Sequence, residues 1–307
     1  MKAAVIREYE IEVEIAETPK PEILADSVLI EVHAASVNPV DNLIRAGYLK
    51  EMMPISFPFI MGFDVSGTVV DVGDQVTKFK QGDEVFSRPN SMQAGTIAEY
   101  TIVKETEIAL KPSNISHAEA ASIPLAGLTA WQALVTKGNL QKGQKVLIHA
   151  GSGGVGTLAI QMAKHLGAHV ATTSSAANFD LVKRLGADTP IDYKTQTFED
   201  ELSDYDLVLD AMGGEIMERS FKVLKKGGAL VSIKGQDTNG LAEKYGVRFE
   251  AFFMWSSGEM LDELAQLMND GILKPVIDRS YPMDQTQEAY DFLQSGRAKG
   301  KVVIQVK

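Results

Sequence analysis

The sequence predicts an α/β protein with two domains, one rich in short strands and one built on a doubly wound parallel sheet. Three observations support this prediction. The chain has 307 residues, 45% of them hydrophobic, whereas single cores rarely grow beyond about 250–300 residues. Residues 1 to about 115 read as short strands broken by Gly and Pro turns. From about residue 120, apolar strands alternate with helical periodicity, a pattern typical of parallel sheets.

Short strands are expected in the first part of the chain wherever β-branched residues cluster between turns. Val28–Val32 and Ser66–Val72 are two examples. Two similar segments, Val72–Val76 and Gln81–Val85, place Gly-Asp between apolar residues, which is turn chemistry. Their aspartates are therefore expected to form turns and not to take part in catalysis.

Strands and helices alternate in the second part of the chain. The apolar strand Val146–Ile148 is followed by apolar residues spaced i, i+3, i+4, i+7, i+8 and i+11 from Val155 to Leu166, which form one face of a helix. The same reasoning predicts strands at His169–Thr173, Leu207–Leu209 and Ala229–Ile233, and helices at Asn178–Leu185 and Glu215–Leu224.

The last part of the chain holds an apolar run, a helix and a final strand. Glu259–Asn269 has helical periodicity, and the strand Lys301–Val306 is expected to return to the first domain. Phe249–Trp255 is apolar enough to form an edge strand. Because an exposed hydrophobic edge tends to pair with another chain, a homodimer is expected.

Composition and charge argue against several classes of function. The chain carries 30 Lys and Arg against 41 Asp and Glu, a net charge of −11, so nucleic-acid binding is not expected. It has no cysteine, which excludes disulfides, thiolate zinc sites and a cysteine nucleophile. Its five histidines show no metal-ligand spacing. No run approaches 18 apolar residues and charge appears early, so neither a membrane partner nor a signal peptide is expected, and the expected location is cytoplasmic.

A glycine-rich turn follows the strand Val146–Ile148. Gly151, Gly153 and Gly156 match the pattern G-x-G-x-x-G between an apolar strand and an amphipathic helix. In such a turn the first glycine permits the bend, the second lets the backbone approach a pyrophosphate, and the third allows the helix to pack on the strand. The helix N-terminus then offers free N–H groups to phosphate. The motif predicts dinucleotide binding in a Rossmann domain; the alternative is a plain tight turn.

The end of the next strand bears on the choice of cofactor. An NAD site usually places Asp or Glu about 20 residues after the glycine turn, where it bonds the ribose 2′-hydroxyl. Thr172–Asn178 has no acid and offers the hydroxyls of Ser174 and Ser175. Since a carboxylate would repel a 2′-phosphate and hydroxyls can donate to it, NADPH is the expected cofactor, although no Arg or Lys lies in this stretch.

Six motifs together resemble the medium-chain dehydrogenase/reductase superfamily, and within it the zinc-free quinone oxidoreductase branch. They are Val37–Asp41, Gly62–Gly67, Pro124–Trp131, Ala150–Gly156, Asp210–Gly214 and Gly300–Val303. The resemblance covers nearly the whole chain. It implies a GroES-like β-barrel domain formed by residues 1–120 and 262–307, and a Rossmann domain formed by residues 121–261.

The resemblance also implies that the catalytic zinc of other superfamily members is absent. Those members place Cys where Asn38 stands and His where Phe63 stands. Neither Asn nor Phe supplies the thiolate or imidazole that zinc requires, and Asp64 alone does not make a site. No metal is therefore expected, and the reaction is expected to be direct hydride transfer from reduced nicotinamide to an electron-poor acceptor.

In the resembling branch, Asn, Asp and Tyr side chains line the nicotinamide pocket. The matching residues are Asn38, Asp41 and Tyr48. The resemblance implies that Asn38 and Tyr48 donate hydrogen bonds to substrate or nicotinamide, and that Asp41 organises them. The alternatives are that Asn38-Pro39 forms a turn and that Asp41 caps a helix.

The remaining candidates would contact the cofactor. Thr129 matches a nicotinamide contact, with helix packing as the alternative, and Tyr193 matches a position beside the 2′-phosphate. Asn178 stands where some relatives carry Lys. His149, at the mouth of the turn, is expected to be a satisfied strand-end histidine. The full set of expected cofactor contacts is Thr129, Gly151, Ser152, Gly153, Gly154, Val155, Gly156, Ser174, Ser175, Asn178, Tyr193 and Met212.

Three functions are consistent with these residues. The first is NADPH-dependent reduction of a quinone. The second is NADPH-dependent reduction of an activated C=C bond in enones, enals or enoyl thioesters, which a positioned proton donor such as Tyr48 would favour. The third is a low-turnover NADPH-binding sensor or regulator, since the sequence shows no unmistakable catalytic acid or base.

Overall fold

The computed structural model describes residues 1–90 and 95–307, which form two compact units. Unit 1 comprises Met1–Leu128, Trp255–Gly271 and Pro275–Lys307, and unit 2 comprises Thr129–Met254 and Ile272–Lys274. The sequence suggested boundaries at 120/121 and 261/262. In the structure, unit 1 ends at Leu128 and resumes at Trp255, a few residues from these points. The first junction falls inside α3 (Pro124–Trp131). A change of sequence pattern shows where a helix begins, but it does not show that a domain boundary lies within the helix.

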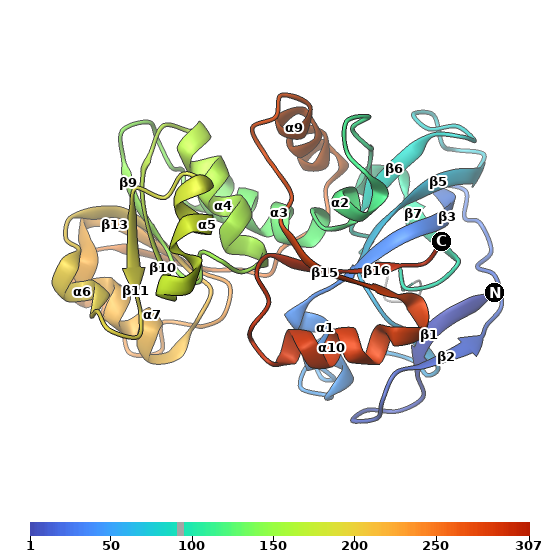
Figure 1. The fold of residues 1–307 in the computed structure, drawn as a ribbon, viewed down its shortest axis with the longest axis horizontal. Helices are drawn as coiled ribbons and strands as arrows, with labels where there is room; N and C mark the ends of the chain where they lie inside the picture. Colours follow the sequence, from blue (N-terminus) through green and yellow to red (C-terminus); the bar gives the residue numbers. More distant parts are fainter. Residues whose placement is uncertain (91–94) are drawn as a thin grey trace. The chain divides into compact units, whose positions relative to one another are not determined.

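Unit 1 is built on two β-sheets (Figure 1). The larger sheet has the strand order β15-β16-β3-β5-β6-β8, with β7 also paired to β3, and the smaller sheet has the order β2-β1-β4. The strands are β1 Lys2–Ile6, β2 Glu14–Glu17, β3 Ser27–Val37, β4 Phe59–Ile60, β5 Asp64–Val72, β6 Glu84–Ser87, β7 Tyr100–Lys104, β8 Ile108–Leu110, β15 Ile277–Pro282 and β16 Lys301–Gln305. The α-helices are α1 Pro39–Arg45, α2 His117–Ala121, α9 Gly258–Asn269 and α10 Thr286–Gln294.

Strand β16 joins the larger sheet of unit 1. It pairs antiparallel with β3, with Val302 opposite Val37 and Gln305 opposite Ala34, and it pairs parallel with β15. This pairing confirms the prediction that the strand returns to the first part of the chain. It also brings Lys301, at the start of β16, beside the end of β3.

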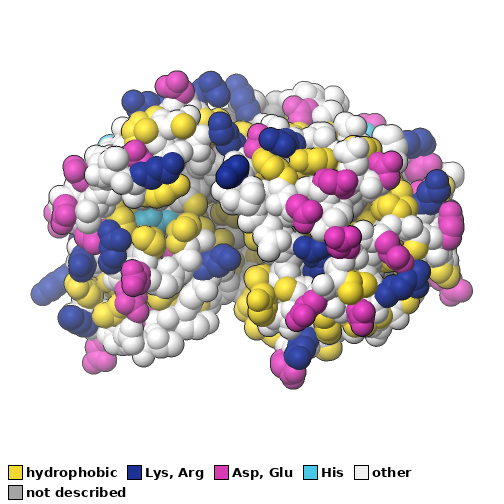
Figure 2. All heavy atoms as spheres, turned by 60° about the horizontal axis from the view of Figure 1, so that its bottom comes forward, with side chains coloured by type: hydrophobic (Ala, Val, Ile, Leu, Met, Phe, Trp, Pro, Cys, Tyr) yellow, Lys and Arg dark blue, Asp and Glu magenta, His cyan; other side chains and the backbone are white. Residues whose placement is uncertain are grey.

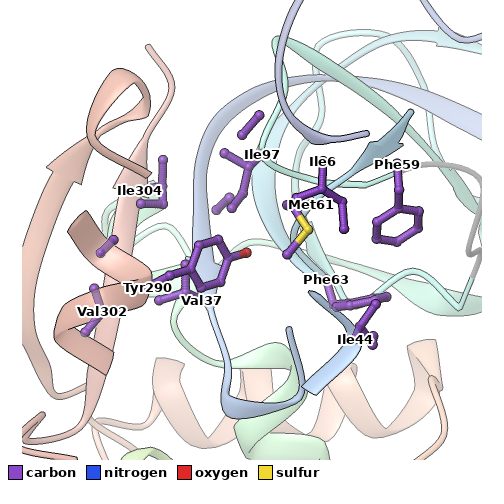
Figure 3. Packing of buried hydrophobic residues seen from close by; sticks show 13 residues of the cluster. Ile6, Val37, Ile44, Phe59, Met61, Phe63, Ile97, Tyr290, Val302 and Ile304 are labelled. Atoms are coloured by element: carbon purple, nitrogen blue, oxygen red, sulfur yellow. The ribbon is translucent and has the colours of Figure 1, made fainter. Parts of the chain in front are cut away.

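A hydrophobic core in unit 1 joins strands of both sheets to helices α1 and α10. Figure 3 shows the buried side chains of this core, among them Ile6, Ile44 and Ile304. Each such side chain contributes about 1.5–3 kcal/mol by leaving water. Tyr290 extends from α10 into the cluster with its hydroxyl leading (Figure 3). A fully buried phenol needs a hydrogen-bond partner there.

Unit 2 is a parallel sheet with helices between its strands (Figure 1). The strand order is β11-β10-β9-β12-β13-β14, and all neighbouring pairs are parallel. This is the 3-2-1-4-5-6 order of a Rossmann fold, with its switch point between β9 and β12, so the predicted doubly wound sheet is confirmed. The strands are β9 Lys145–Ile148, β10 His169–Ser174, β11 Thr189–Asp192, β12 Tyr205–Asp210, β13 Leu224–Ser232 and β14 Arg248–Ala251. The helices are the π-helix Gln132–Lys137, α4 Gly154–His165, α5 Phe179–Arg184, α6 Phe198–Glu201, α7 Gly214–Ser220 and α8 Leu241–Tyr245.

Some elements of unit 2 differ from the sequence prediction. Strand β11 was missed because Thr189–Asp192 is short and contains a proline. The predicted helix Glu215–Leu224 ends earlier and continues as the 3-10 turn Phe221–Val223. Of the expected edge segment Phe249–Trp255 only the first three residues are in a strand, β14 (Arg248–Ala251), which does lie at the edge of the sheet. It stops there because its partner β13 ends at the same register.

Charged side chains of both signs are spread over the surface. On the face that Figure 2 shows, Lys and Arg lie among Asp and Glu. Among the helices that the structure describes, none is long and apolar enough to cross a membrane.

Candidate functional site

The glycine turn of unit 2 lies at the switch point of its sheet, between β9 and α4. Ala150 has a φ of 54°, a left-handed conformation that is uncommon for a residue with a side chain. The Gly151 N–H donates to the Thr173 carbonyl at 2.9 Å, and the Gly153 N–H donates to the Ala150 carbonyl at 3.0 Å. Backbone hydrogen bonds thus fix the turn, both to strand β10 and within itself.

The three motif glycines differ in the space around them. A Cβ on Gly151 would lie 1.9 Å from Thr172 Oγ1, and one on Gly156 would lie 2.3 Å from the Ala150 carbonyl oxygen. Contacts within the protein therefore leave no room for a side chain at Gly151 or Gly156. A Cβ on Gly153 would meet, among the described atoms, only the Ala150 oxygen at 3.3 Å. The protein therefore crowds position 153 less than positions 151 and 156, and close approach of a phosphate gives a further reason for glycine there.

The first turn of α4 presents backbone donors. The helix begins after Gly153, and no side chain in the described part of the chain caps it. The N–H groups of Gly154, Val155 and Gly156 therefore have no acceptor within the helix. A pyrophosphate would accept hydrogen bonds from them at the positive end of the helix dipole. The residues present thus fit a dinucleotide.

The loop after β10 carries the side chains expected near the adenine ribose. Ser174 is buried, and its hydroxyl donates to the Ser175 carbonyl at 3.3 Å. Asn178 Nδ2 donates to Ser152 Oγ at 3.0 Å, which ties this loop to the glycine turn. Asn178 Oδ1 is buried with no hydrogen-bond partner in the described structure. This half-buried side chain thus has an unused acceptor oxygen, which fits a ligand group that donates a hydrogen bond.

Strand β11 adds two residues to this end of the sheet. Asp192 lies opposite Ser174 in the strand register, so an acid does stand beside the loop. Its oxygens turn to its own chain, where Oδ1 accepts from the Lys194 N–H at 3.1 Å and Oδ2 from Thr195 Oγ1 at 3.3 Å. Tyr193 is 61% exposed. The sequence reasoning considered only the end of β10 and therefore missed Asp192.

His149 is buried behind the glycine turn. Its Nε2 lies 2.8 Å from Ser220 Oγ and its Nδ1 lies 3.1 Å from Thr173 Oγ1. Because the Ser220 hydroxyl donates to the Ile216 carbonyl, Nε2–H donates to Ser220, and Nδ1 accepts from Thr173. Burial lowers the pKa of His149 to about 4, so the ring is neutral at pH 7. The prediction of a satisfied strand-end histidine is confirmed.

Met212 and Thr129 occupy contrasting environments. Met212 is 53% exposed in a loop that Asp210 anchors, since Asp210 Oδ1 accepts from the Met212 N–H at 2.9 Å and the Gly213 N–H at 3.0 Å. Thr129 is 5% exposed within α3. The loop geometry holds Met212 at a fixed place on the surface of unit 2.

A buried polar cluster lies at the end of β3 in unit 1. Asp64 Oδ2 accepts from Ser36 Oγ at 2.7 Å and from Asn38 Nδ2 at 2.8 Å. The same oxygen accepts from Lys301 Nζ at 3.1 Å. Asp64 Oδ1 accepts from the Leu125 backbone N–H at 2.7 Å. Strands β3, β5 and β16 thus bring a carboxylate, an ammonium and an amide together out of water.

Asp41 lies next to this cluster in the first turn of α1. Its Oδ2 accepts from the Asn38 backbone N–H at 2.9 Å and from the Tyr290 hydroxyl at 3.2 Å, which supplies the partner that the buried phenol needs. Burial raises the pKa of Asp41 to about 7, against the lowering effects of the Asn38 N–H and the Lys301 charge. Its Oδ1 is buried without a partner among the described residues. Asp41 therefore caps α1, one of the two alternatives, and holds a proton near neutral pH.

Tyr48 does not belong to this cluster. It follows α1, and its side chain is 79% exposed. Its backbone N–H donates to the Leu43 carbonyl at 3.0 Å. The structure thus brings Asn38 and Asp41 together and leaves Tyr48 on the surface of unit 1, so its role as a donor stays a prediction.

The positions where zinc-dependent enzymes hold metal serve other purposes here. Phe63 packs in the core, with the Arg88 guanidinium 5.4 Å from its ring centroid. The Asn38 amide is engaged by Asp64 and Lys301. Within residues 1–90 and 95–307, no group of three or more His, Asp or Glu side chains is placed to hold a metal ion.

Comparison with known proteins decides the family. The model of the alcohol dehydrogenase GroES-like domain matches residues 24–113, and the model of the zinc-binding dehydrogenase matches residues 185–304. A 2-methylene-furan-3-one reductase of Solanum lycopersicum is 43% identical over 294 residues, which cover 92% of this chain and 73% of that relative. The chain belongs to the medium-chain dehydrogenase/reductase superfamily.

Other similar proteins lie in the quinone oxidoreductase branch of this superfamily or close to it. The chloroplastic NADPH-dependent alkenal/one oxidoreductase of Arabidopsis thaliana is 40% identical, with 92% of this chain and 73% of the relative covered. The quinone oxidoreductase structure from Coxiella burnetii has a TM-score of 0.91 and 34% identity, with 100% and 99% covered. That of Escherichia coli quinone oxidoreductase complexed with NADPH has 0.89 and 25%, with 100% of both chains covered. The predicted GroES-like and Rossmann fold is confirmed, and this superfamily member is an oxidoreductase.

The sequence reasoning missed two members of the buried cluster. Ser36 and Lys301 were not singled out, and Asp64 was considered only as a metal ligand. A signal was present, because Lys301 is a charged residue directly before the apolar run Val302–Ile304. A charge in such a place is buried only with partners.

Proposed function

We propose that this chain is an NADPH-dependent reductase of conjugated carbonyl compounds, either activated alkenes or quinones. The observation that carries the proposal is the contrast at Gly153, where a Cβ would meet only the Ala150 carbonyl oxygen at 3.3 Å, with Gly151 and Gly156, where a Cβ would clash with the protein. A glycine at such a position serves the close approach of a pyrophosphate to the backbone. The membership in an oxidoreductase superfamily supports a nicotinamide dinucleotide as the ligand.

The side chains around the end of β10 support NADPH rather than NADH. The Ser175 hydroxyl can donate to a 2′-phosphate, and the Ser174 hydroxyl can do so by turning from the Ser175 carbonyl. Asn178 Nδ2 has a second proton beyond the one that it donates to Ser152. Asp192 is the nearest acid by strand register, but its oxygens are engaged with its own turn. The similar Escherichia coli enzyme was solved in complex with NADPH.

The buried cluster of unit 1 supports a conjugated carbonyl as the acceptor. When bound, NADPH supplies the hydride, and a proton from solvent or from a side chain completes the reduction. Negative charge grows on the carbonyl oxygen, where a fixed N–H donor stabilises it. Asn38 Nδ2 carries two protons, of which Asp64 accepts one, so the other serves as that donor. The Asp41 carboxyl group accepts from the Asn38 backbone N–H and so holds Asn38 in place. The exposed Tyr48 is proposed as a second donor to the substrate.

The relatives favour activated alkenes over quinones. The two at 43% and 40% identity are named for a methylene-furanone and for alkenals and alkenones, in which C=C is conjugated to C=O. The quinone oxidoreductases of known structure are 34% and 25% identical. Because a quinone has the same conjugated carbonyl, one donor at Asn38 serves either acceptor.

The test measures NADPH consumption with 1-octen-3-one and with 1,4-benzoquinone, each against an enzyme-free background. The expected result is saturable turnover of the enone, with the saturated ketone identified as the product. Turnover of the quinone alone would move the assignment to a quinone reductase. Tight NADPH binding without turnover of either acceptor would contradict the proposal and favour a sensor.

The quaternary state and the location are proposals as well. Strand β14 forms an edge of the unit 2 sheet, and Phe253, two residues after β14, is 66% exposed. A homodimer that covers this edge is expected, and light scattering that shows a monomer at micromolar concentration would contradict it. The cytoplasmic location rests on composition, and recovery in an organelle fraction after cell fractionation would contradict it.

A further inference from the structure

The Lys301 ammonium is a buried cation whose three protons are all used. Lys301 is 5% exposed, and its Nζ donates to the Val37 carbonyl at 3.3 Å, to Asn38 Oδ1 at 2.5 Å and to Asp64 Oδ2 at 3.1 Å. An ammonium has three donors and no acceptor. Lys301 therefore has nothing left to offer a substrate directly.

The Asn38 amide is held between this cation and an anion. Its Oδ1 accepts from Lys301, and its Nδ2 donates to Asp64 at 2.8 Å. A flipped amide would set NH₂ against the ammonium and C=O against the carboxylate, so both contacts would become repulsive. The two charges together thus fix one orientation of the amide.

Stability does not account for this arrangement. Both charges of the Asp64–Lys301 pair lie out of water, with Asp64 fully buried. Desolvation offsets most of the attraction in such a pair, and well-packed apolar residues often do as well or better. An oriented amide is something that apolar residues could not provide.

We propose that Lys301 is a positioning residue for the reduction and acts through Asn38. Lys301 holds Asn38 Oδ1, while Asp64 accepts one of the two Nδ2 protons. The second Nδ2 proton then points away from Asp64 and is available to the carbonyl oxygen of the substrate. The inference rests on the proposed function, in which Asn38 donates to that oxygen. It adds a residue from the far end of the chain to the site.

A double-mutant cycle with Asn38→Leu and Lys301→Met tests the proposal. Each single variant is expected to lower kcat for the acceptor by about 10-fold or more, the scale for loss of one oxyanion donor. The affinity for NADPH, measured by fluorescence titration, is expected to stay unchanged. The double variant is expected to be no slower than Asn38→Leu alone, because Lys301 acts only through Asn38. Lys299→Met removes an exposed lysine from the same segment and is the matched control.

Two outcomes separate failure of this inference from failure of the proposed function. If Asn38→Leu lowers kcat while Lys301→Met does not, or if the two effects multiply, the positioning role is wrong and the function stands. If Asn38→Leu leaves kcat unchanged, the donor role of Asn38 is wrong. Lys301→Gln keeps a donor for Asn38 Oδ1 without the charge and is expected to be partly active. It replaces Lys301→Met in the cycle if the Met variant does not fold.

A measurement without turnover tests the orientation itself. In ¹⁵N spectra of the wild type, the side-chain amide of Asn38 is identified as the pair of signals that Asn38→Leu removes. Two distinct and slowly exchanging protons are expected in the wild type and in Lys299→Met. In Lys301→Met or Lys301→Gln the pair is expected to shift and exchange faster. An unchanged pair in both Lys301 variants would overturn the proposal even if no acceptor were turned over.

Discussion

His149 Nε2 lies 2.8 Å from the hydroxyl of Ser220, and the imidazole is neutral because burial lowers its pKa to about 4. In the unfolded chain the pKa returns to about 6.5, so the unfolded state binds the proton more tightly between these values. The stability that neutral His149 contributes is present above pH 6.5 and is lost as pH falls towards 4, by about 3 kcal/mol in all.

This loss predicts a difference between the wild type and His149→Gln. The wild type is expected to lose melting temperature more steeply between pH 6.5 and pH 4.5 than the variant, whose amide does not titrate. Differential scanning fluorimetry across that range measures both slopes, with His165→Gln as a control outside the turn. Parallel curves for wild type and His149→Gln would contradict the prediction.

Asp41 has the opposite dependence on pH. Its pKa is raised to about 7 in the folded state from 3.8, so the folded protein holds the proton more tightly. The associated stability is complete below pH 3.8 and is lost as pH rises through 7, by about 4 kcal/mol. Asp41→Asn is isosteric and still accepts from Asn38 and Tyr290. Its melting temperature is expected to match the wild type at pH 4 and to exceed it at pH 8, whereas the exposed-site control Asp74→Asn shows no such divergence.

The glycine turn predicts a separation of stability from cofactor affinity. Gly153→Ala is expected to lower the melting temperature less than Gly151→Ala, since its Cβ would meet only the Ala150 carbonyl oxygen, at 3.3 Å, among the described atoms, and to weaken NADPH binding about 10-fold or more. Gly151→Ala is expected to cost about 1–3 kcal/mol of stability, because its Cβ would lie 1.9 Å from Thr172 Oγ1. Thermal melts and NADPH titrations of both variants provide the check. A destabilised Gly153→Ala with unchanged affinity would refute this account of the turn.

The position of Ser174 predicts a change in cofactor preference. Ser174→Asp adds a carboxylate at the last residue of β10, where it would repel a 2′-phosphate and accept from a 2′-hydroxyl. The ratio of kcat/KM for NADPH over NADH is expected to fall by about 10-fold or more, a difference of about 1.4 kcal/mol. An unchanged ratio would contradict the placement of the 2′-phosphate. Thr189→Asp, on the neighbouring strand and away from the loop, is the control.

Sequence patterns predicted the parts of the molecule whose structure depends on residues close together in the chain. The strand, the glycine motif and the helix follow one another directly along the chain, from Lys145 to His165, so hydrophobic periodicity and the motif predict them. The same is true of His149, which a strand end places beside Thr173. The family motifs extended this to the whole fold, including the return of β16.

Pairings between distant segments could not be predicted in this way. Asn38 and Lys301 are 263 residues apart, and Asp41 and Tyr290 are 249 apart. No sequence period records such contacts, because they depend on which strand β16 joins and on how α10 packs. The exposure of Tyr48 is a similar case, since an aromatic residue after a short helix has no pattern that assigns it to core or surface.

The pairing of β3 with β16 has a consequence for biosynthesis. Val37 and Lys301 meet across 264 positions of chain, and most of unit 2 is made in between. The sheet of unit 2 is almost contiguous in sequence and is complete once β14 has left the ribosome. In β3, by contrast, the part of one edge at residues 34–37 stays unpaired until β16 emerges, whereas β7 already pairs with residues 27–31. An open strand edge of this kind is open to wrong partners. The unit whose synthesis begins first is thus the unit whose larger sheet is completed last.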